Sequence, residues 1–178
     1  MILGAGKMGS FFVDLLSFEH TTAVYDIDPK RLRFMYNTER FTTLEEIAEF
    51  KPELVINAVT LKYTLDVFKQ VMPYLPSDCI LSDISSVKTG LREFYEQCGR
   101  RYVSTHPMFG PTFANLGALS NENAIIITEG DYMGRIFLRT STAAWDFTSV
   151  STPSMLTMKL LPILWAPPSF PPSCFLPS

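Results

Sequence analysis

Over residues 1–130 the chain alternates between short apolar runs and stretches in which apolar residues recur at helical spacing. The apolar runs predict buried strands at residues 1–3, 22–25, 54–58, 79–81, 102–105 and 124–128. The first stretch with helical spacing presents one apolar face, made of Met8, Phe11, Phe12, Leu15 and Leu16. Strands that alternate with helices are typical of βαβ units. We therefore predict an α/β fold, a Rossmann-like, doubly wound and mostly parallel sheet.

Two helix starts carry capping signals of their own. Asp28 is an N-cap residue, and Pro29 follows it at the first helical position. Thr43 and Glu46 have the spacing of a capping box. Both signals predict that a helix begins directly after a short polar turn.

A glycine-rich turn follows the first predicted strand. Its sequence, GAGKMG, matches the GxGxxG pattern of dinucleotide-binding turns. In that pattern the first glycine allows a tight turn, the second leaves room for a pyrophosphate, and the third lets the helix pack closely on the strand. The helix N-terminus then offers free N–H groups to the phosphates. The predicted cofactor-binding residues of this turn are Gly4, Gly6, Lys7, Met8 and Gly9.

An acidic residue ends the second predicted strand, about twenty residues after the turn. This residue, Asp26, can accept hydrogen bonds from the hydroxyls of a ribose. It favours NAD, because the 2′-phosphate of NADP would meet a like charge there. Lys30 and Arg31 follow closely enough in sequence to keep NADP possible.

Further segments leave the carboxyl ends of later strands, where the ligand crevice of a doubly wound sheet lies. Asn57, Ala58, Val59 and Ser85 are therefore predicted to complete the cofactor site. Ser85 and its neighbour Ser86 are equally suited to cap a helix that starts near residue 87. The lysine that follows, Lys88, is either solvated or attracts an anionic substrate.

His106 is one of two histidines, and the proline-containing sequence PMFGP after it predicts a rigid loop. It either packs in that loop against a backbone carbonyl or acts in catalysis. Removal of hydride from a carbon that bears a hydroxyl requires a group that takes the hydroxyl proton, and histidine is suited to this near neutral pH. His106 is therefore the predicted catalytic residue.

Composition excludes several other functions. Fifteen basic against eighteen acidic residues give a net charge of −3, so there is no basic excess for nucleic acid or an anionic membrane. The three cysteines include no CxxC pair, which disfavours disulfides and a metal site. No secretory signal and no apolar stretch of membrane-spanning length is present. We expect a cytoplasmic, metal-free protein that binds a small molecule.

Two further motifs, SDISSVKTGL at residues 82–91 and STHPMFGP at residues 104–111, follow GAGKMG. With them the chain resembles prephenate dehydrogenases of tyrosine biosynthesis, in the branch with HPMFGP that also occurs in fusions with chorismate mutase. The resemblance implies oxidative decarboxylation of prephenate, or of arogenate, to an aromatic product such as 4-hydroxyphenylpyruvate, with hydride transfer to NAD(P). It implies that His106 draws off the proton of the substrate hydroxyl and that Ser86 orients both partners.

The composition changes near residue 137. Residues 1–137 hold thirty of the thirty-three charged residues, whereas residues 138–178 hold seven of the thirteen prolines. We predict a dinucleotide-binding domain over 1–137 and a tail rich in proline, serine and threonine over 138–178, disordered or frameshifted. The resemblance implies a second, helical domain through which the family forms homodimers, and we expect that domain to be absent or replaced here. Codons can be chosen for residues 156–175 so that the frame one base earlier spells HDETIAYSLGTPFVSTFVF, which resembles the start of that domain.

Two alternatives stay open. The chain is a binding module that holds a dinucleotide without turnover, or it is another small-molecule oxidoreductase with a GxGxMG turn, such as a hydroxyacid dehydrogenase or an imine reductase. The pair of motifs SSVK and HPMFGP argues against the second alternative.

Overall fold

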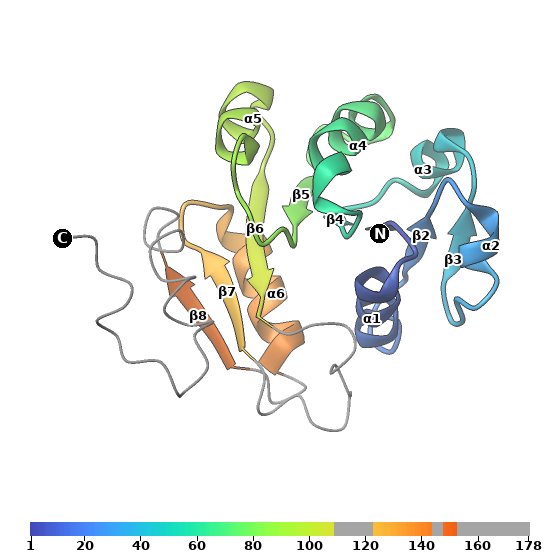
Figure 1. The fold of residues 1–178 in the computed structure, drawn as a ribbon, viewed down its shortest axis with the longest axis horizontal. Helices are drawn as coiled ribbons and strands as arrows, with labels where there is room; N and C mark the ends of the chain where they lie inside the picture. Colours follow the sequence, from blue (N-terminus) through green and yellow to red (C-terminus); the bar gives the residue numbers. More distant parts are fainter. Residues whose placement is uncertain (109–122, 144–147, 153–178) are drawn as a thin grey trace.

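The computed structural model describes residues 1–108, 123–143 and 148–152, and within them eight strands form one sheet (Figure 1). The order across the sheet is β3-β2-β1-β4-β5-β6-β7-β8. The strands are β1 (Ile2–Leu3), β2 (Ala23–Tyr25), β3 (Glu39–Phe41), β4 (Leu54–Asn57), β5 (Ile80–Asp83), β6 (Tyr102–Pro107), β7 (Asn123–Ile127) and β8 (Thr148–Thr152).

Helices cover both faces of this sheet (Figure 1). The α-helices are α1 (Lys7–Leu16), α2 (Pro29–Leu32), α3 (Leu44–Phe50), α4 (Thr64–Val71), α5 (Leu91–Cys98) and α6 (Tyr132–Ala143). Two short 3₁₀ turns, η1 (Leu61–Tyr63) and η2 (Met72–Tyr74), flank α4. Helices α1 and α6 lie on one face, and α3, α4 and α5 lie on the other (Figure 1).

Strands β1 to β6 are parallel and run in the order 3-2-1-4-5-6, which is the order of a Rossmann sheet. Strand β7 pairs antiparallel with β6, and β8 pairs parallel with β7. The predicted Rossmann-like, doubly wound and mostly parallel fold is therefore confirmed.

Successive residues of the central strands alternate between two hydrophobic cores, one on each face of the sheet. In β1, Ile2 packs with residues of α1, and Leu3 packs on the opposite side with residues of α3 and α4. Both side chains are fully buried. Burial on both faces is the reason that the parallel strands read as continuous apolar runs in the sequence.

The predicted helix starts agree with the structure. Asp28 caps α2, where its side chain accepts a hydrogen bond from the backbone N–H of Lys30 at 3.0 Å. At the start of α3, the carboxylate of Glu46 accepts hydrogen bonds from the backbone N–H and the hydroxyl of Thr43, at 2.8 and 2.9 Å.

The segment after β5 differs from the prediction. Helix α5 begins at Leu91 rather than near residue 87, and its N-cap is Gly90, with a φ of +77°. Residues 84–90 are irregular, so Ser85 and Ser86 do not cap a helix. Strand β6 also continues through His106 to Pro107, which places the histidine in a strand rather than in a loop.

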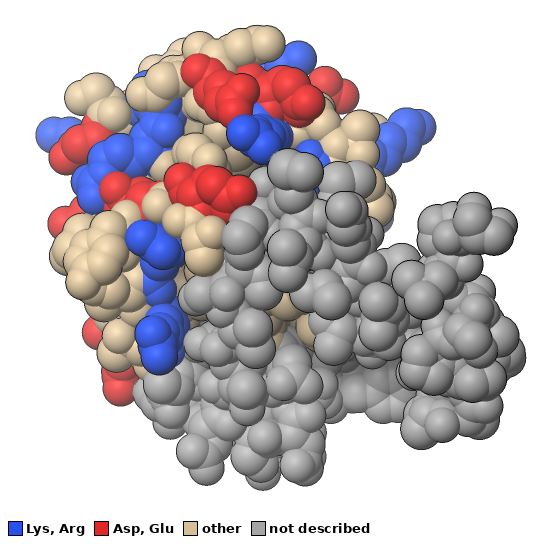
Figure 2. Space-filling model, turned by 90° about the vertical axis from the view of Figure 1, so that its left-hand side faces the viewer, with Lys and Arg blue, Asp and Glu red and all other residues tan. Residues whose placement is uncertain are grey.

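The described fold extends past the change of composition at residue 137. Helix α6 runs across that position, and β8 lies beyond it. Residues 153–178, which include most of the proline-rich tail, lie outside the described residues, so the division into a domain and a tail stays a prediction. In the described ranges no helix is long and apolar enough to cross a membrane. On the face shown in Figure 2, acidic and basic side chains are interspersed.

The start of α1 packs closely against the turn after β1. A Cβ atom added to Gly9 would lie 1.8 Å from the carbonyl oxygen of Gly4. A Cβ added to Gly6 would meet no atom within 4 Å. The two glycines of one turn therefore differ in what a methyl group would do there.

Replacing Gly9 with alanine should force α1 away from β1 and lower the free energy of unfolding by about 1–3 kcal/mol. The matched control is Gly6→Ala, which should cost less than about 1 kcal/mol because the added methyl group enters open space at an N-cap. Urea denaturation of both variants measures the difference. Equal midpoints would show that α1 does not depend on this contact.

Candidate dinucleotide and proton-transfer site

The glycine turn has the backbone geometry that phosphate binding requires. Gly4 has a φ of +94°, a conformation that favours glycine, and its N–H donates to the carbonyl of Tyr25 at 2.8 Å. Among the described residues no side chain caps α1, so the N–H groups of its first turn face outward with the positive end of the helix dipole. Together with the open space beside Gly6, this arrangement fits a pyrophosphate group.

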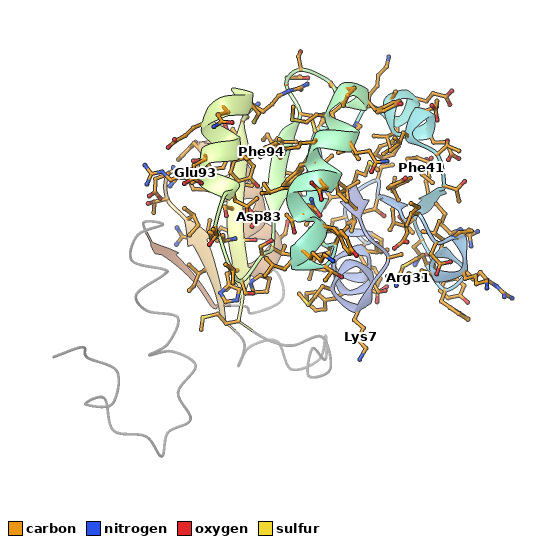
Figure 3. All side chains as sticks on the ribbon, turned by 45° about the horizontal axis from the view of Figure 1, so that its top comes forward. Lys7, Arg31, Phe41, Asp83, Glu93 and Phe94 are labelled. Carbon is orange, nitrogen blue, oxygen red and sulfur yellow. The ribbon has the colours of Figure 1, made fainter. Side chains whose placement is uncertain are left out.

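The two residues between the last two glycines have different surroundings. Lys7 is exposed and projects away from the ribbon (Figure 3). Met8 is half-buried and packs against the core on the α1 side of the sheet. Lys7 is thus available to a phosphate, whereas Met8 contributes to packing.

Asp26 is buried beside the glycine turn at the end of β2. Its carboxylate accepts hydrogen bonds from the N–H of Ala5 at 2.7 Å and from the N–H of Asp28 at 2.8 Å. The guanidinium of Arg31 lies 3.9 Å from the same carboxylate. Asp26 therefore fixes the turn as well as standing where a ribose would approach.

Asn57 at the end of β4 is 1% exposed, and its side chain serves the protein backbone. Its Nδ2 donates to the carbonyl of Thr64 at 3.0 Å, and its Oδ1 accepts from the N–H of Val59 at 3.3 Å. A Cβ on Gly4 would lie 3.0 Å from Cγ1 of Val59 and 3.3 Å from the carbonyl carbon of Ala58. The structure thus brings Asn57, Ala58 and Val59 close to the glycine turn. The hydrogen bonds of the Asn57 side chain hold the backbone of this segment.

The two predicted serines have different surroundings. Ser85 is buried, and its hydroxyl lies 3.4 Å from the hydroxyl of Thr64, the residue whose carbonyl accepts a hydrogen bond from Asn57. Ser86 is exposed and, within the described residues, forms no hydrogen bond with His106. The role of Ser86 beside His106 therefore stays a prediction.

A buried carboxylate, Asp83, lies at the end of β5 and inside the fold (Figure 3). It is 0% exposed. Its Oδ1 accepts a hydrogen bond from the hydroxyl of Tyr95 at 2.8 Å, and its Oδ2 accepts from the N–H of Ser85 at 3.1 Å. The ammonium of Lys88 lies 2.5 Å from the same Oδ2. Since an unpaired buried charge is very costly, these partners are what allow Asp83 to be ionised there.

Lys88 is consequently turned inward, and its side chain is 8% exposed. The prediction that it is a solvated residue is wrong, because Asp83 and the carbonyl of Thr105 draw the ammonium into the fold. Burial lowers the pKa of Lys88, and the neighbouring Asp83 carboxylate opposes that effect.

His106 is 8% exposed in β6, where it lies opposite Ile125 of β7. Its Nδ1 is buried and has no hydrogen-bond partner among the described residues. Burial lowers the pKa of His106 and the Lys88 ammonium lowers it further, while the Asp83 carboxylate raises it. The imidazole is thus held neutral near pH 7, in the form that accepts a proton. Residues 109–111 of the HPMFGP motif lie outside the described residues.

Asp83 and Tyr95 were not among the predicted site residues. A signal for Asp83 exists in the sequence, because an acidic residue ends the buried run of β5 and a lysine follows five positions later. Nothing local marks Tyr95, whose apolar neighbours on α5 make it look like an ordinary core residue.

The strand order, the glycine turn and the buried acid at the end of β2 together define a dinucleotide-binding domain of the dehydrogenase class. Comparison with known families gives the particular one. The family model described as prephenate dehydrogenase, nucleotide-binding domain, matches residues 16–146. The chain therefore belongs to the prephenate dehydrogenase family.

Individual relatives agree with this family. A probable arogenate/prephenate dehydrogenase of Methanocaldococcus jannaschii is 37% identical over 79 residues, which cover 43% of this chain and 18% of that protein. The crystal structure of prephenate dehydrogenase from Aquifex aeolicus has a TM-score of 0.78 at 19% identity, with 92% of this chain and 65% of that chain covered. The same enzyme in complex with hydroxyphenyl propionate and NAD⁺ has a TM-score of 0.77 at 20% identity, with 90% and 61% covered. The chain thus spans under a fifth of the first relative and about two thirds of the second.

The hydroxyl of Tyr95 should contribute measurably to stability because Asp83 is buried. Tyr95→Phe removes the donor to Oδ1 of Asp83 and should lower the free energy of unfolding by about 1–3 kcal/mol. The control is Tyr102→Phe, since the Tyr102 ring stacks on Tyr95 at 4.2 Å but its hydroxyl has no hydrogen-bond partner in the described part of the chain. Chemical denaturation compares them. If both variants lost the same stability, the bond to Asp83 would have no special weight.

Proposed function

We propose that this chain is the cofactor-binding and proton-accepting part of an NAD-dependent prephenate or arogenate dehydrogenase. The observation that carries the proposal is His106, a buried and neutral histidine at the carboxyl end of β6. The carboxyl ends of parallel strands share one edge of a sheet, so His106 and the glycine turn after β1 lie at the same edge, where a doubly wound sheet binds its ligand. The family membership supports the same reaction.

In this proposal the backbone of Gly4, Gly6 and Gly9 and the N-terminus of α1 hold the pyrophosphate, with Lys7 close by in sequence. Asp26 accepts the ribose hydroxyls, and the backbone of Ala58 and Val59 borders the cofactor. Bound NAD would supply the hydride acceptor. His106 takes the proton of the substrate hydroxyl while the hydride leaves the carbon that bears this hydroxyl. Loss of CO₂ then makes the ring aromatic, and the phenolate oxygen so formed takes the proton back. Protonation of His106 before the reaction would remove the acceptor.

Ser85 and Ser86 have separate roles in the proposal. Ser85, whose hydroxyl lies next to that of Thr64, helps to hold the backbone of the site in place. Ser86 is exposed at the same edge, so its hydroxyl is free to orient the substrate. The homodimer of the family, the tyrosine pathway and a cytoplasmic location stay predictions of the resemblance and of the sequence.

The experiment that tests the proposal measures NADH formation with prephenate and, separately, NAD binding by fluorescence. Turnover would establish the dehydrogenase. Binding without turnover would favour the alternative, a domain that holds NAD without reacting. An absence of binding would contradict both.

His106 should be required for turnover and dispensable for NAD binding. In His106→Asn the imidazole is lost, and NADH formation with prephenate should fall by at least about 100-fold with an unchanged Kd for NAD. The control is His20→Asn, because His20 is exposed and lies on the other side of the fold from β6's end, next to Phe137. In the unsubstituted chain turnover should fall as the pH drops through the lowered pKa of His106, where the neutral base is lost. A parallel loss of NAD affinity in His106→Asn would mean that the residue is structural.

NAD should bind more tightly than NADP. The 2′-phosphate would approach the Asp26 carboxylate, and this like-charge contact should weaken NADP binding by at least about tenfold. Arg31→Ala removes the guanidinium 3.9 Å from Asp26 and should weaken NADP further while NAD affinity stays the same. Arg33→Ala, an exposed arginine on the same short segment, is the control. Isothermal titration with both cofactors decides, and equal affinities would contradict the role given to Asp26.

A further inference from the structure

Lys88 connects the irregular segment after β5 with the backbone directly before His106. Its Nζ donates to the carbonyl of Thr105 at 2.6 Å and lies 2.5 Å from Oδ2 of Asp83. The hydroxyl of Thr105 donates in turn to the carbonyl of Asp83 at 3.0 Å. These three contacts form a closed ring between the ends of β5 and β6. The ring holds the peptide to which His106 is attached.

The pairing also explains why a lysine is tolerated at this depth. A buried ammonium needs an opposite charge and acceptors for its N–H groups, and Asp83 and Thr105 supply both. A lysine that attracted substrate would leave its ammonium exposed, whereas the side chain of Lys88 is 8% exposed. Lys88 is therefore better suited to act on its neighbours in the protein than on a ligand in the crevice.

We propose that Lys88 is a positioning residue: together with Asp83 it fixes the end of β6, and its own ammonium helps to keep His106 in the proton-accepting form. The catalytic consequence rests on the proposed function, but the effect on His106 does not. Tyr95 belongs to the same device, because its hydroxyl holds the second oxygen of Asp83.

The charges around His106 give the direction of this effect. Among the described residues, the charged side chains that act on the imidazole are Lys88, in the segment after β5, and Asp83, at the end of β5. The ammonium lowers the pKa of His106, the carboxylate raises it, and the ammonium has the larger influence. Removing the charge of Lys88 should therefore raise the pKa of His106 whether or not Asp83 stays ionised.

The test is the pKa of His106, measured by NMR titration of the imidazole signals without cofactor or substrate. The chain has two histidines, so His20→Gln assigns the spectrum, and the exposed His20 serves as an internal reference. In Lys88→Met we expect the pKa of His106 to rise by on the order of one pH unit, with His20 unchanged. Lys62→Met, at an exposed lysine outside this network, is the control and should change neither signal.

A second variant keeps the test decisive if Lys88→Met does not fold, since it leaves a buried carboxylate without its cation. Asp83→Asn/Lys88→Met removes both charges and keeps similar side-chain volumes. It should still raise the pKa of His106, because the ammonium has the larger influence of the two. An unchanged pKa of His106 in either folded variant would overturn the proposal.

The same variants separate this inference from the proposed function. If the chain turns over prephenate, the acidic limb of the pH–rate profile should move to higher pH in Lys88→Met, because the neutral imidazole is then lost at a higher pH. A raised pKa of His106 in a chain without turnover would support the inference and contradict only the proposed activity.

Discussion

The close approach of α1 to β1 is the constraint on which the rest of the domain depends. Strand β1 has two residues, yet it lies in the middle of the Rossmann part of the sheet, between β2 and β4. So short a strand contributes few ladder hydrogen bonds, and the packing of α1 must hold it from one side. This packing is possible because Gly9, which faces the carbonyl of Gly4, has no Cβ. The glycine turn and the centre of the fold are thus one feature.

A second constraint is the burial of charge at the end of β5. The carboxylate of Asp83 has no exposure to water, so it determines which groups can surround it. Tyr95 comes to it from α5, and Lys88 comes from the segment between β5 and α5. Lys88, which pairs with the Asp83 carboxylate at the end of β5, also donates to the carbonyl of Thr105. The lysine therefore ties the end of β6 to the end of β5. This network holds the backbone before His106, and beside the larger effect of burial its Lys88 ammonium lowers the pKa of the imidazole.

Features with a local cause could be predicted from the sequence. The glycine turn and the helix starts at Asp28 and Thr43 each depend on residues within a few positions of one another, and the acid at the end of β2 has a fixed spacing from the turn. The irregular segment 84–90 could not be predicted, because Lys88 meets a carbonyl seventeen residues away, and the apolar spacing from residue 87 onward reads as helix. The strand at His106 could not be predicted either, since it exists through antiparallel pairing with β7.

The two halves of the site therefore rest on different physics. Around the glycine turn the tightest requirement is steric, and a dinucleotide would meet a preformed backbone. Around His106 the requirements are electrostatic, and the same ammonium that lowers the pKa of the imidazole also ties β6 to β5. A substitution of Lys88 that changes the pKa of His106 therefore also alters the stability of β6. This coupling makes the end of β5, rather than the glycine turn, the part of the site in which chemistry and folding cannot be changed independently.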